Sequence, residues 1–196
     1  MNIYDISQEV FGCRVYPGDP SPSREKLSSI DEGELYNLTA FSMCAHNGTH
    51  VDAPYHFLNE GATVDKIPLS KTVGEAFVTE YNGVLDEKGA MAILEKAERN
   101  DPEAAKRILI KGDALVTEAA ARVFAEAEIG LLGVESQSVG PEDAPMAVHK
   151  ILLGREVVLL EGIRLSDVSE GVYLLCAAPL CLAGADGAPC RAILIG

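Results

Sequence analysis

The chain has 196 residues, of which 47% are hydrophobic, and a formal net charge of −14. A chain of this size and hydrophobicity can bury a substantial core, so we expect one folded domain over residues 1–196. The negative charge argues against a nucleic-acid partner, because proteins bind nucleic acids through basic patches. The longest apolar run, residues 171–185, is shorter than the roughly 20 residues that cross a bilayer, so no membrane partner is expected.

The cysteines indicate a reducing compartment. There are five of them, none forms a C-x-x-C pair, and the chain opens without the apolar segment of a secretory signal. Reduced thiols and a cytoplasmic location are therefore the simplest expectation.

The first half of the chain predicts strands separated by turns. Residues 2–7 and 38–45 have the pattern of strands, whereas residues 16–22 carry the prolines and the glycine of a turn. Residues 72–81 predict another strand. Residues 88–99 have the apolar spacing of an amphipathic helix.

The second half mixes strands with helices. Residues 107–111 and 129–135 predict buried strands on either side of a helix over 118–128, for which Thr117 is a suitable N-cap. Residues 145–154 predict a further helix. Strands are also expected at 157–161, 172–176, 180–183 and 192–195, with a hairpin turn at 186–187 between the last two. This half argues against a purely parallel sheet.

Residues 44–57 concentrate groups that bind metal ions. Three of the four histidines fall here, and His46, His50, Asp52 and His56 follow one another at short intervals. Imidazole and carboxylate are usual ligands of divalent cations, whereas a plain loop or core has no packing reason to collect them. The stretch therefore predicts a metal site.

Glycine and proline predict the path of this stretch. Gly48 argues against a regular helix between His46 and His50, and Pro54 ends any extended piece that follows. A bend, an extended piece and a turn would bring the first two histidines and the aspartate onto one ion, with the third histidine beside it. Cys44 is expected to be a small core residue, although a thiolate ligand stays open.

The motif His46-x-Gly48-Thr49-His50-x-Asp52-x-Pro54-x-His56-Phe57 resembles the signature of the metal-dependent cyclase family, which includes bacterial kynurenine formamidase and isatin hydrolase. Three weaker segments follow the family's order and extend the resemblance over nearly the full chain. They are Tyr16-Pro17-Gly18-Asp19-Pro20, Gly133-Val134-Glu135-Ser136-Gln137-Ser138, and His149-Lys150-Ile151-Leu152-Leu153 followed by Leu160-Glu161-Gly162. Glu135 stands where the family more often has Asp. Its position near a strand end would suit a contact with the substrate or with a metal ligand, but its side chain is expected at the surface.

The resemblance implies an α/β fold of the swivelling β/β/α type, with a mixed sheet curled into a barrel-like core, and a homodimer or homotetramer. It also adds two metal ligands to the central stretch, so that the implied set is His46, His50, Asp52, His149 and Glu161. Five ligands are enough for two ions with shared groups. Two Zn²⁺ ions are favoured and Mn²⁺ is the alternative, because nitrogen and oxygen ligands separate these metals poorly.

The activity implied by the resemblance is metal-dependent hydrolysis of an amide, or of a cyclic amide or ester. Conversion of N-formylkynurenine to kynurenine and formate is the best-known case in the family. We expect His56 to take the proton of the attacking water and return it to the leaving group, since a histidine titrates near neutral pH. Tyr16 and Phe57 are expected to contact the small-molecule substrate.

Two other classes of function stay open. The same metal site would serve a lyase, dehydratase or cyclase that acts on a small carbonyl substrate, and it would also suit a non-catalytic metal-binding module. The chain has no G-x-G-x-x-G loop, no Walker lysine loop and no G-x-S-x-G motif. Nucleotide-binding and serine-hydrolase functions are therefore not indicated.

Overall fold

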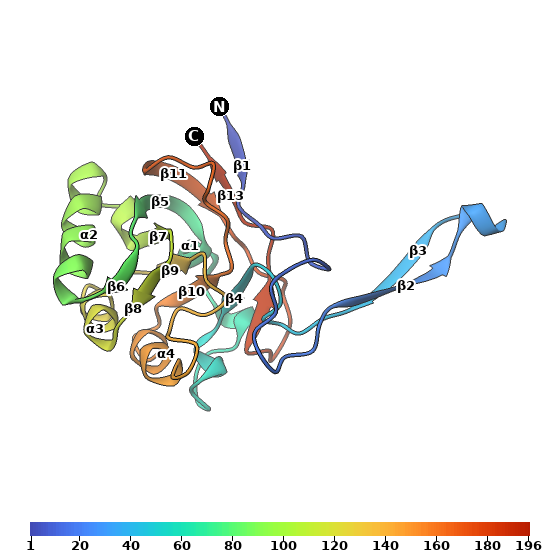
Figure 1. Ribbon diagram of the computed structural model, residues 1–196, viewed down its shortest axis with the longest axis horizontal. Helices are drawn as coiled ribbons and strands as arrows, with labels where there is room; N and C mark the ends of the chain where they lie inside the picture. Colours follow the sequence, from blue (N-terminus) through green and yellow to red (C-terminus); the bar gives the residue numbers. More distant parts are fainter.

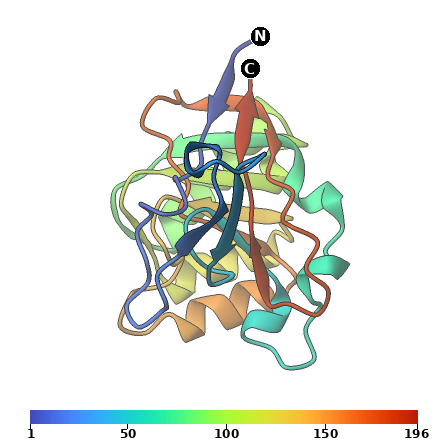
Figure 2. The same cartoon turned by 90° about the vertical axis from the view of Figure 1, so that its right-hand side faces the viewer.

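One nine-stranded sheet, curled into a half-barrel, organises the fold (Figures 1 and 2). The computed structural model describes all 196 residues. Across the sheet the strands follow the order β1 (Ile3–Asp5), β13 (Ile193–Ile195), β11 (Gly171–Cys176), β5 (Val73–Glu80), β7 (Arg107–Lys111), β9 (Leu131–Val134), β10 (Val158–Glu161), β4 (His50–Asp52) and β12 (Gly187–Pro189). The predicted α/β fold with a mixed, curled sheet is confirmed.

The middle of the sheet is parallel and its margins are antiparallel. Strands β5, β7, β9 and β10 run in parallel, and every other neighbouring pair is antiparallel. Parallel neighbours need crossover connections, and the helices on these crossovers bury one face of the strands, whereas the core inside the curl of the sheet buries the other. This is why they read as continuous apolar runs, such as Ile108-Leu109-Ile110 in β7.

These runs contribute to two separate hydrophobic cores. Ile108 and Ile110 pack with Phe124 in the core under the helices, whereas Leu109 and Leu160 belong to the core inside the curl of the sheet. Successive side chains of a strand point to opposite faces, so one strand supplies both cores. The rigid layer between the cores carries the strand ends that form the site.

Three helices cover one face of the parallel strands (Figure 1): α2 (Glu87–Asn100), α3 (Glu118–Glu126) and α4 (Met146–Leu153). The first two begin at side-chain caps, because Asp86 accepts a hydrogen bond from the Gly89 N–H and the Thr117 hydroxyl accepts one from the Ala120 N–H. The remaining short elements are α1 (Leu69–Thr72), β6 (Gly83–Leu85) and β8 (Ala114–Val116). No helix combines the length and the apolar character needed to span a membrane.

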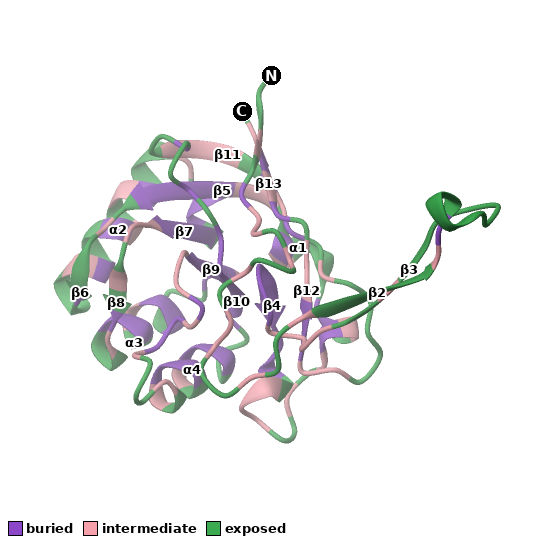
Figure 3. Cartoon of the chain, turned by 45° about the vertical axis from the view of Figure 1, so that its right-hand side comes forward, coloured by how far each residue is buried: buried purple, intermediate pink, exposed green.

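A hairpin of β2 (Ser23–Ser28) and β3 (Leu38–Ser42) projects from the body as an arm (Figures 1 and 3). Its strands pair only with each other, and most of their residues are exposed. Six exposed apolar side chains lie on the arm: Leu27, Ile30, Leu35, Tyr36, Leu38 and Phe41. The strand predicted over 38–45 exists as β3, but it ends earlier and lies outside the nine-stranded sheet.

Two predictions for the C-terminal segment are wrong. Residues 180–183 form no strand, because local turns take up their backbone groups: Leu182 N–H donates to Leu180 O, and Ala185 N–H donates to Leu182 O. Residues 186–187 form no hairpin turn, since Gly187 begins β12, which pairs with β4. A short apolar run fits a turn-rich segment as well as a strand, and periodicity does not reveal a distant pairing partner.

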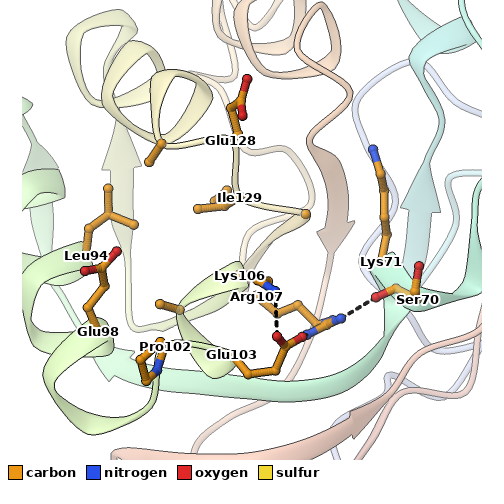
Figure 4. A pocket seen from close by; sticks show the side chains of 13 residues that line it. Ser70, Lys71, Leu94, Glu98, Pro102, Glu103, Lys106, Arg107, Glu128 and Ile129 are labelled. Carbon is orange, nitrogen blue, oxygen red and sulfur yellow. Dashed lines mark hydrogen bonds and ion pairs between the residues drawn. The ribbon is translucent and has the colours of Figure 1, made fainter.

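A buried arginine ties the start of β7 to the neighbouring strand β5 and to the short helix α1 that precedes β5 (Figure 4). The Arg107 guanidinium donates to the carbonyl oxygens of Ser70 and Glu75, the latter at 3.0 Å. It lies against Gly74 on β5, where an added Cβ would be 2.6 Å from Arg107 Cζ. The same guanidinium forms part of the wall of a surface cavity of about 520 Å³ that is lined by both acidic and basic side chains.

This packing predicts that Gly74→Ala is strongly destabilising. The new methyl group would displace the buried guanidinium, so we expect a loss of about 1–3 kcal/mol in the free energy of unfolding, measured by urea denaturation. Gly171→Ala is a matched control, because φ is +156° there and +149° at Gly74, but its Cβ would meet only Tyr173 at 3.7 Å. Equal losses in the two variants would contradict the role given to Arg107.

Candidate metal centre

The ladder between β10 and β4 positions the candidate site. The two strands are antiparallel, with Glu161 opposite His50 and Leu159 opposite Asp52. On its other edge β4 pairs with β12, which places Gly187 opposite Asp52. Because register decides which side chains share a face, backbone hydrogen bonds hold the histidine and the two carboxylates together.

The predicted path of the histidine stretch is confirmed. The chain bends at Gly48, where φ is +69°, runs extended through β4, and turns at Pro54 into a 3-10 helix that carries His56. The bend is tied to the end of β10, because the Thr49 hydroxyl donates to the Gly162 carbonyl at 2.7 Å. Glycine at position 48 is what allows this positive φ without strain.

Asp52 and Glu161 each face two imidazoles. His50 Nε2 lies 3.4 Å from Asp52 Oδ1 and 3.3 Å from Glu161 Oε2. His149 Nε2, carried by α4, lies 3.6 Å from Asp52 Oδ2 and 3.3 Å from Glu161 Oε1. Each carboxylate therefore presents one oxygen to each histidine, which is the arrangement of two ligand groups with shared, bridging carboxylates.

His46 joins the cluster from the bend. Its Nδ1 lies 2.9 Å from Asp52 Oδ1. The ligand atoms of His46, His50 and Asp52 all lie within 4.8 Å of one another, and so do those of Asp52, His149 and Glu161. The two residues that are distant in sequence are thus brought to the central stretch.

The remaining ring nitrogens of two histidines are engaged by backbone carbonyls. His50 Nδ1 donates to the Gly48 carbonyl at 3.0 Å, and His149 Nδ1 donates to the Pro145 carbonyl at 2.8 Å. A hydrogen bond on one nitrogen fixes the orientation of the ring and the nitrogen that faces the cluster. In both rings that nitrogen is Nε2.

Burial and neighbouring charges shift the pKa values of the cluster in opposite directions. Burial alone would lower the pKa of His50, but the adjoining carboxylates of Asp52 and Glu161 outweigh it and raise this pKa to about 10. Burial likewise raises the pKa of Asp52, yet the imidazoles of His46 and His50 hold it well below its usual range. The charged forms stabilise one another, and a cation can take over the role of the imidazole protons.

Two atoms of this cluster have no hydrogen-bond partner although they are buried: His50 Nε2 and Asp52 Oδ2. An unpaired buried polar atom costs free energy, so such atoms call for a partner. Imidazole nitrogen and carboxylate oxygen are ligands that Zn²⁺ and related cations prefer. The residues present therefore fit a divalent cation.

A cavity of about 370 Å³ opens onto the cluster. Tyr16, His56 and Phe57 line it together with histidines of the cluster. The His56 ring stacks on His46 with centroids 4.0 Å apart, and the Phe57 ring lies 4.5 Å from that of His149. Burial lowers the pKa of His56. Every site residue expected from the sequence thus lies in the cluster or in the wall of its cavity.

Two residues of the site are missed by the sequence analysis. Asp186 lines the cavity and contacts two of the histidines. Gln137 lies behind the bend, where its side-chain amide donates to the Gly48 carbonyl at 2.6 Å. Gln137 falls in the family-like segment 133–138, which is a usable signal. Asp186 has no local signal, because only the pairing of β12 with β4 brings it here.

Two other expectations need correction or detail. Glu135 is half-buried, and its carboxylate accepts hydrogen bonds from the Gly112 and Leu165 N–H groups at 2.7 and 2.8 Å. It therefore joins two loops and does not lie free at the surface. Cys44 is half-buried in the cavity wall and belongs to neither of the two three-residue ligand groups described above.

Comparison with known families agrees with this geometry. The family model described as "Putative cyclase" matches residues 4–141. The chain belongs to this family. The matched part includes the N-terminal turn, the whole histidine stretch and the segment 133–138.

Relatives that match along nearly their whole length include two kynurenine formamidases. That of Erythrobacter litoralis (strain HTCC2594) is 32% identical over 206 residues, which cover 98% of this chain and 93% of the relative. That of Salinibacter ruber (strain DSM 13855 / M31) is 34% identical over 212 residues, which cover 99% and 97%. The similarity thus extends over nearly the whole length of both chains.

Solved structures share the fold. A predicted metal-dependent hydrolase from Bacillus stearothermophilus matches with a TM-score of 0.81 and 30% identity, over 98% of this chain and 97% of that one. Isatin hydrolase A from Labrenzia aggregata matches with a TM-score of 0.74 and 22% identity, over 98% and 93%. The second likeness concerns the fold alone.

The buried carboxylates predict that removing a divalent cation destabilises the protein. Zinc-loaded protein treated with a chelator should melt about 5–10 °C lower, because a ligand that binds only the folded state stabilises it. The melting temperature, measured by calorimetry, should recover when zinc is added back.

Two variants make this measurement specific. Glu161→Gln should lose most of the chelator effect, because it removes the charge of a carboxylate that faces both His50 and His149. Glu135→Gln is the control, since that carboxylate binds backbone N–H groups and should leave the effect intact. A chelator effect of the same size in Glu161→Gln would contradict the ligand assignment.

Proposed function

We propose that this protein is a metal-dependent hydrolase that cleaves the C–N bond of an amide or cyclic amide, or the C–O bond of a cyclic ester. The observation that carries the proposal is the shared pair of carboxylates: Asp52 and Glu161 each present one oxygen to His50 and one to His149. Similarity to kynurenine formamidases over nearly the full chain supports an arylformamidase-like activity.

The proposed metal ligands are His46, His50, Asp52, His149 and Glu161. Their two overlapping groups suit two ions, and we propose Zn²⁺ in both positions, with Mn²⁺ as the alternative. Bound there, such ions polarise a carbonyl group and lower the pKa of a coordinated water.

His56 is the proposed proton carrier. It lines the cavity and stacks on His46, and it lies outside the two groups that share Asp52, although it forms a third candidate group with His46 and Asp186. Its Nδ1 faces the Asp186 carboxylate at 3.1 Å, so Nε2 is the nitrogen with the free electron pair. That nitrogen would accept the proton of the attacking water and deliver it to the leaving nitrogen or oxygen.

Tyr16 and Phe57 are the proposed substrate contacts. Both line the cavity, whose volume of about 370 Å³ is in the range of small-molecule sites. Aromatic side chains offer flat surfaces to an arylamine. N-formylkynurenine is therefore the first substrate to test, with simple cyclic amides and lactones next.

A lyase, dehydratase or cyclase reaction is the alternative, because the same groups would polarise a carbonyl and move a proton without attack by water. Turnover of simple formamides or lactones with uptake of water would favour hydrolysis. A purely metal-binding role is disfavoured by the open cavity, which gives a small molecule access to the cluster.

The proposed assembly is a homodimer, or a homotetramer built from it, in which each arm packs on a second copy. A two-stranded hairpin is marginally stable alone, and Leu35 at its tip is 93% exposed. At the base of the arm a cavity of about 590 Å³ is lined by Phe11, Phe41 and Leu180, among others. Burying these apolar surfaces against each other would remove both from water.

A cytoplasmic location is also part of the proposal. All five cysteines are free of disulfides, as in a reducing compartment.

His56→Ala tests the catalytic role. We expect kcat for N-formylkynurenine hydrolysis to fall by about 10²–10⁴-fold, because proton transfer contributes on this order, while metal content measured by elemental mass spectrometry is unchanged. Tyr55→Phe is the control, since the neighbouring phenol is partly exposed and lies outside the cavity wall. Full activity in metal-loaded His56→Ala would remove His56 from the mechanism.

The arm predicts a concentration-dependent assembly. A Leu35→Asp and Leu38→Asp double variant should shift the mass measured by light scattering from dimer towards monomer, because charge replaces apolar contact area. Leu115→Asp is the control, as this exposed leucine lies on β8, far along the chain from the arm. A wild-type protein that is monomeric at high micromolar concentration would refute the proposed dimer.

A further inference from the structure

The Asp186 carboxylate contacts two histidines of the site at once. Its Oδ2 atom lies 2.7 Å from His46 Nε2 and 3.1 Å from His56 Nδ1. The two rings are stacked with an interplanar angle of 27°, so their edges face the carboxylate side by side. One atom of Asp186 therefore joins a proposed metal ligand to the proposed proton carrier.

The backbone holds this carboxylate in place. Asp186 directly precedes β12, and its carbonyl oxygen accepts a hydrogen bond from the Ala53 N–H at 2.9 Å. The next residue, Gly187, passes so close to the histidine bend that an added Cβ would be 2.7 Å from His46 Cε1. A larger residue there would push the ring away from the carboxylate, so the close approach depends on glycine.

The chemistry of a carboxylate decides which ring nitrogens carry hydrogen. An ionised carboxylate only accepts hydrogen bonds, so the nitrogens that face Asp186 must be donors. His56 is then the Nδ1–H tautomer, which leaves its Nε2 free to accept a proton. His46 faces a carboxylate with each nitrogen: Nε2 donates to Asp186, and Nδ1, 2.9 Å from Asp52, carries a hydrogen that a bound cation would replace.

We propose that Asp186 is a positioning residue shared by two histidines, one that fixes the tautomer and ring orientation of both His56 and His46. Its effect on turnover rests on the proposed function, whereas its effect on the tautomers does not. Carboxylates that orient ligand and catalytic histidines in this manner act through the ring and do not touch the substrate.

The chain is well suited to a direct test, because it has only four histidines. Zinc-loaded protein labelled with ¹⁵N-histidine gives one set of ring signals for each of them, and His56→Ala identifies the signals of His56. Long-range ¹H–¹⁵N spectra distinguish the Nδ1–H tautomer from the Nε2–H tautomer. The wild type should show His56 as Nδ1–H, and Asp186→Ala should lose this preference.

Kinetics and metal content complete the test. In Asp186→Ala at saturating zinc, kcat should fall by about 10–100-fold with the zinc content unchanged, which is the usual cost of losing such an orienting group. KM should stay within about twofold, because ground-state binding is not removed. Asp186→Asn should restore the tautomer and part of kcat, since its amide oxygen still accepts a hydrogen bond.

Asp65→Ala is the matched control. That carboxylate accepts hydrogen bonds from the Gly184 N–H at 3.1 Å and from the Thr63 hydroxyl at 2.6 Å, so it anchors the same loop without touching the histidines. Its removal should leave the His56 tautomer and kcat unchanged. Equal changes in Asp65→Ala and Asp186→Ala would reduce Asp186 to a loop anchor and overturn the proposal.

The remaining outcomes separate this proposal from the proposed function. Loss of zinc from Asp186→Ala at saturation would make Asp186 a ligand, in the third group that it forms with His46 and His56, and would overturn the positioning role. An unchanged His56 tautomer would overturn it as well. If the wild type hydrolyses no amide or lactone, the proposed function fails, and the tautomer measurement still decides the role of Asp186.

Discussion

Two carboxylates buried side by side determine which groups must surround them in the site. The side chains of Asp52 and Glu161 are 0% and 3% exposed, and each lies opposite the same two imidazoles. Burying charge is costly unless it is paired, and two like charges in one place repel each other. The surrounding groups must therefore supply positive charge, which three histidines and a bound cation would do together. The density of histidine in residues 44–57 is the consequence of this need.

The register of the sheet places a histidine next to the two buried carboxylates. Strand β10 ends at Glu161, and its antiparallel partner β4 presents His50 and Asp52 from the same face, so the ladder alone brings three of the five proposed ligands together. A slip of one residue would turn His50 and Asp52 away from Glu161, to the opposite face. The continuous apolar runs of the parallel strands, buried in two cores, resist such a slip. The packing of the core therefore fixes the strand register, and the strand register fixes the geometry of the site.

The parts of the site that could be predicted from the sequence are those whose residues are close together in the chain. His46, His50 and Asp52 share one bend and one short strand, so glycine, proline and residue spacing were enough to predict their path. His149 and Glu161 came only through the family resemblance, because nothing near them indicates a ligand. For Asp186 the sequence predicts a hairpin turn, because nothing local indicates the pairing of β12 with β4, which are far apart in the chain. The exposed strand β2 was missed because its sequence, Ser-Arg-Glu-Lys-Leu-Ser, has no core-facing pattern.

The site contains one carboxylate at its solvent-exposed rim and two that are buried inside it. Asp186 is 42% exposed at the rim, whereas Asp52 and Glu161 are enclosed. The enclosed pair is surrounded by imidazoles, with one backbone N–H, that of Val139, donating to Glu161. It gains most from a cation, because electrostatic interactions are strongest where water is excluded. The rim carboxylate keeps contact with solvent, so it can stay ionised at little cost while it orients the rings in front of it. His46 faces both kinds at once, through Nδ1 inward and Nε2 outward. A single imidazole therefore couples the position of the cation to the orientation of the histidine that would carry the proton.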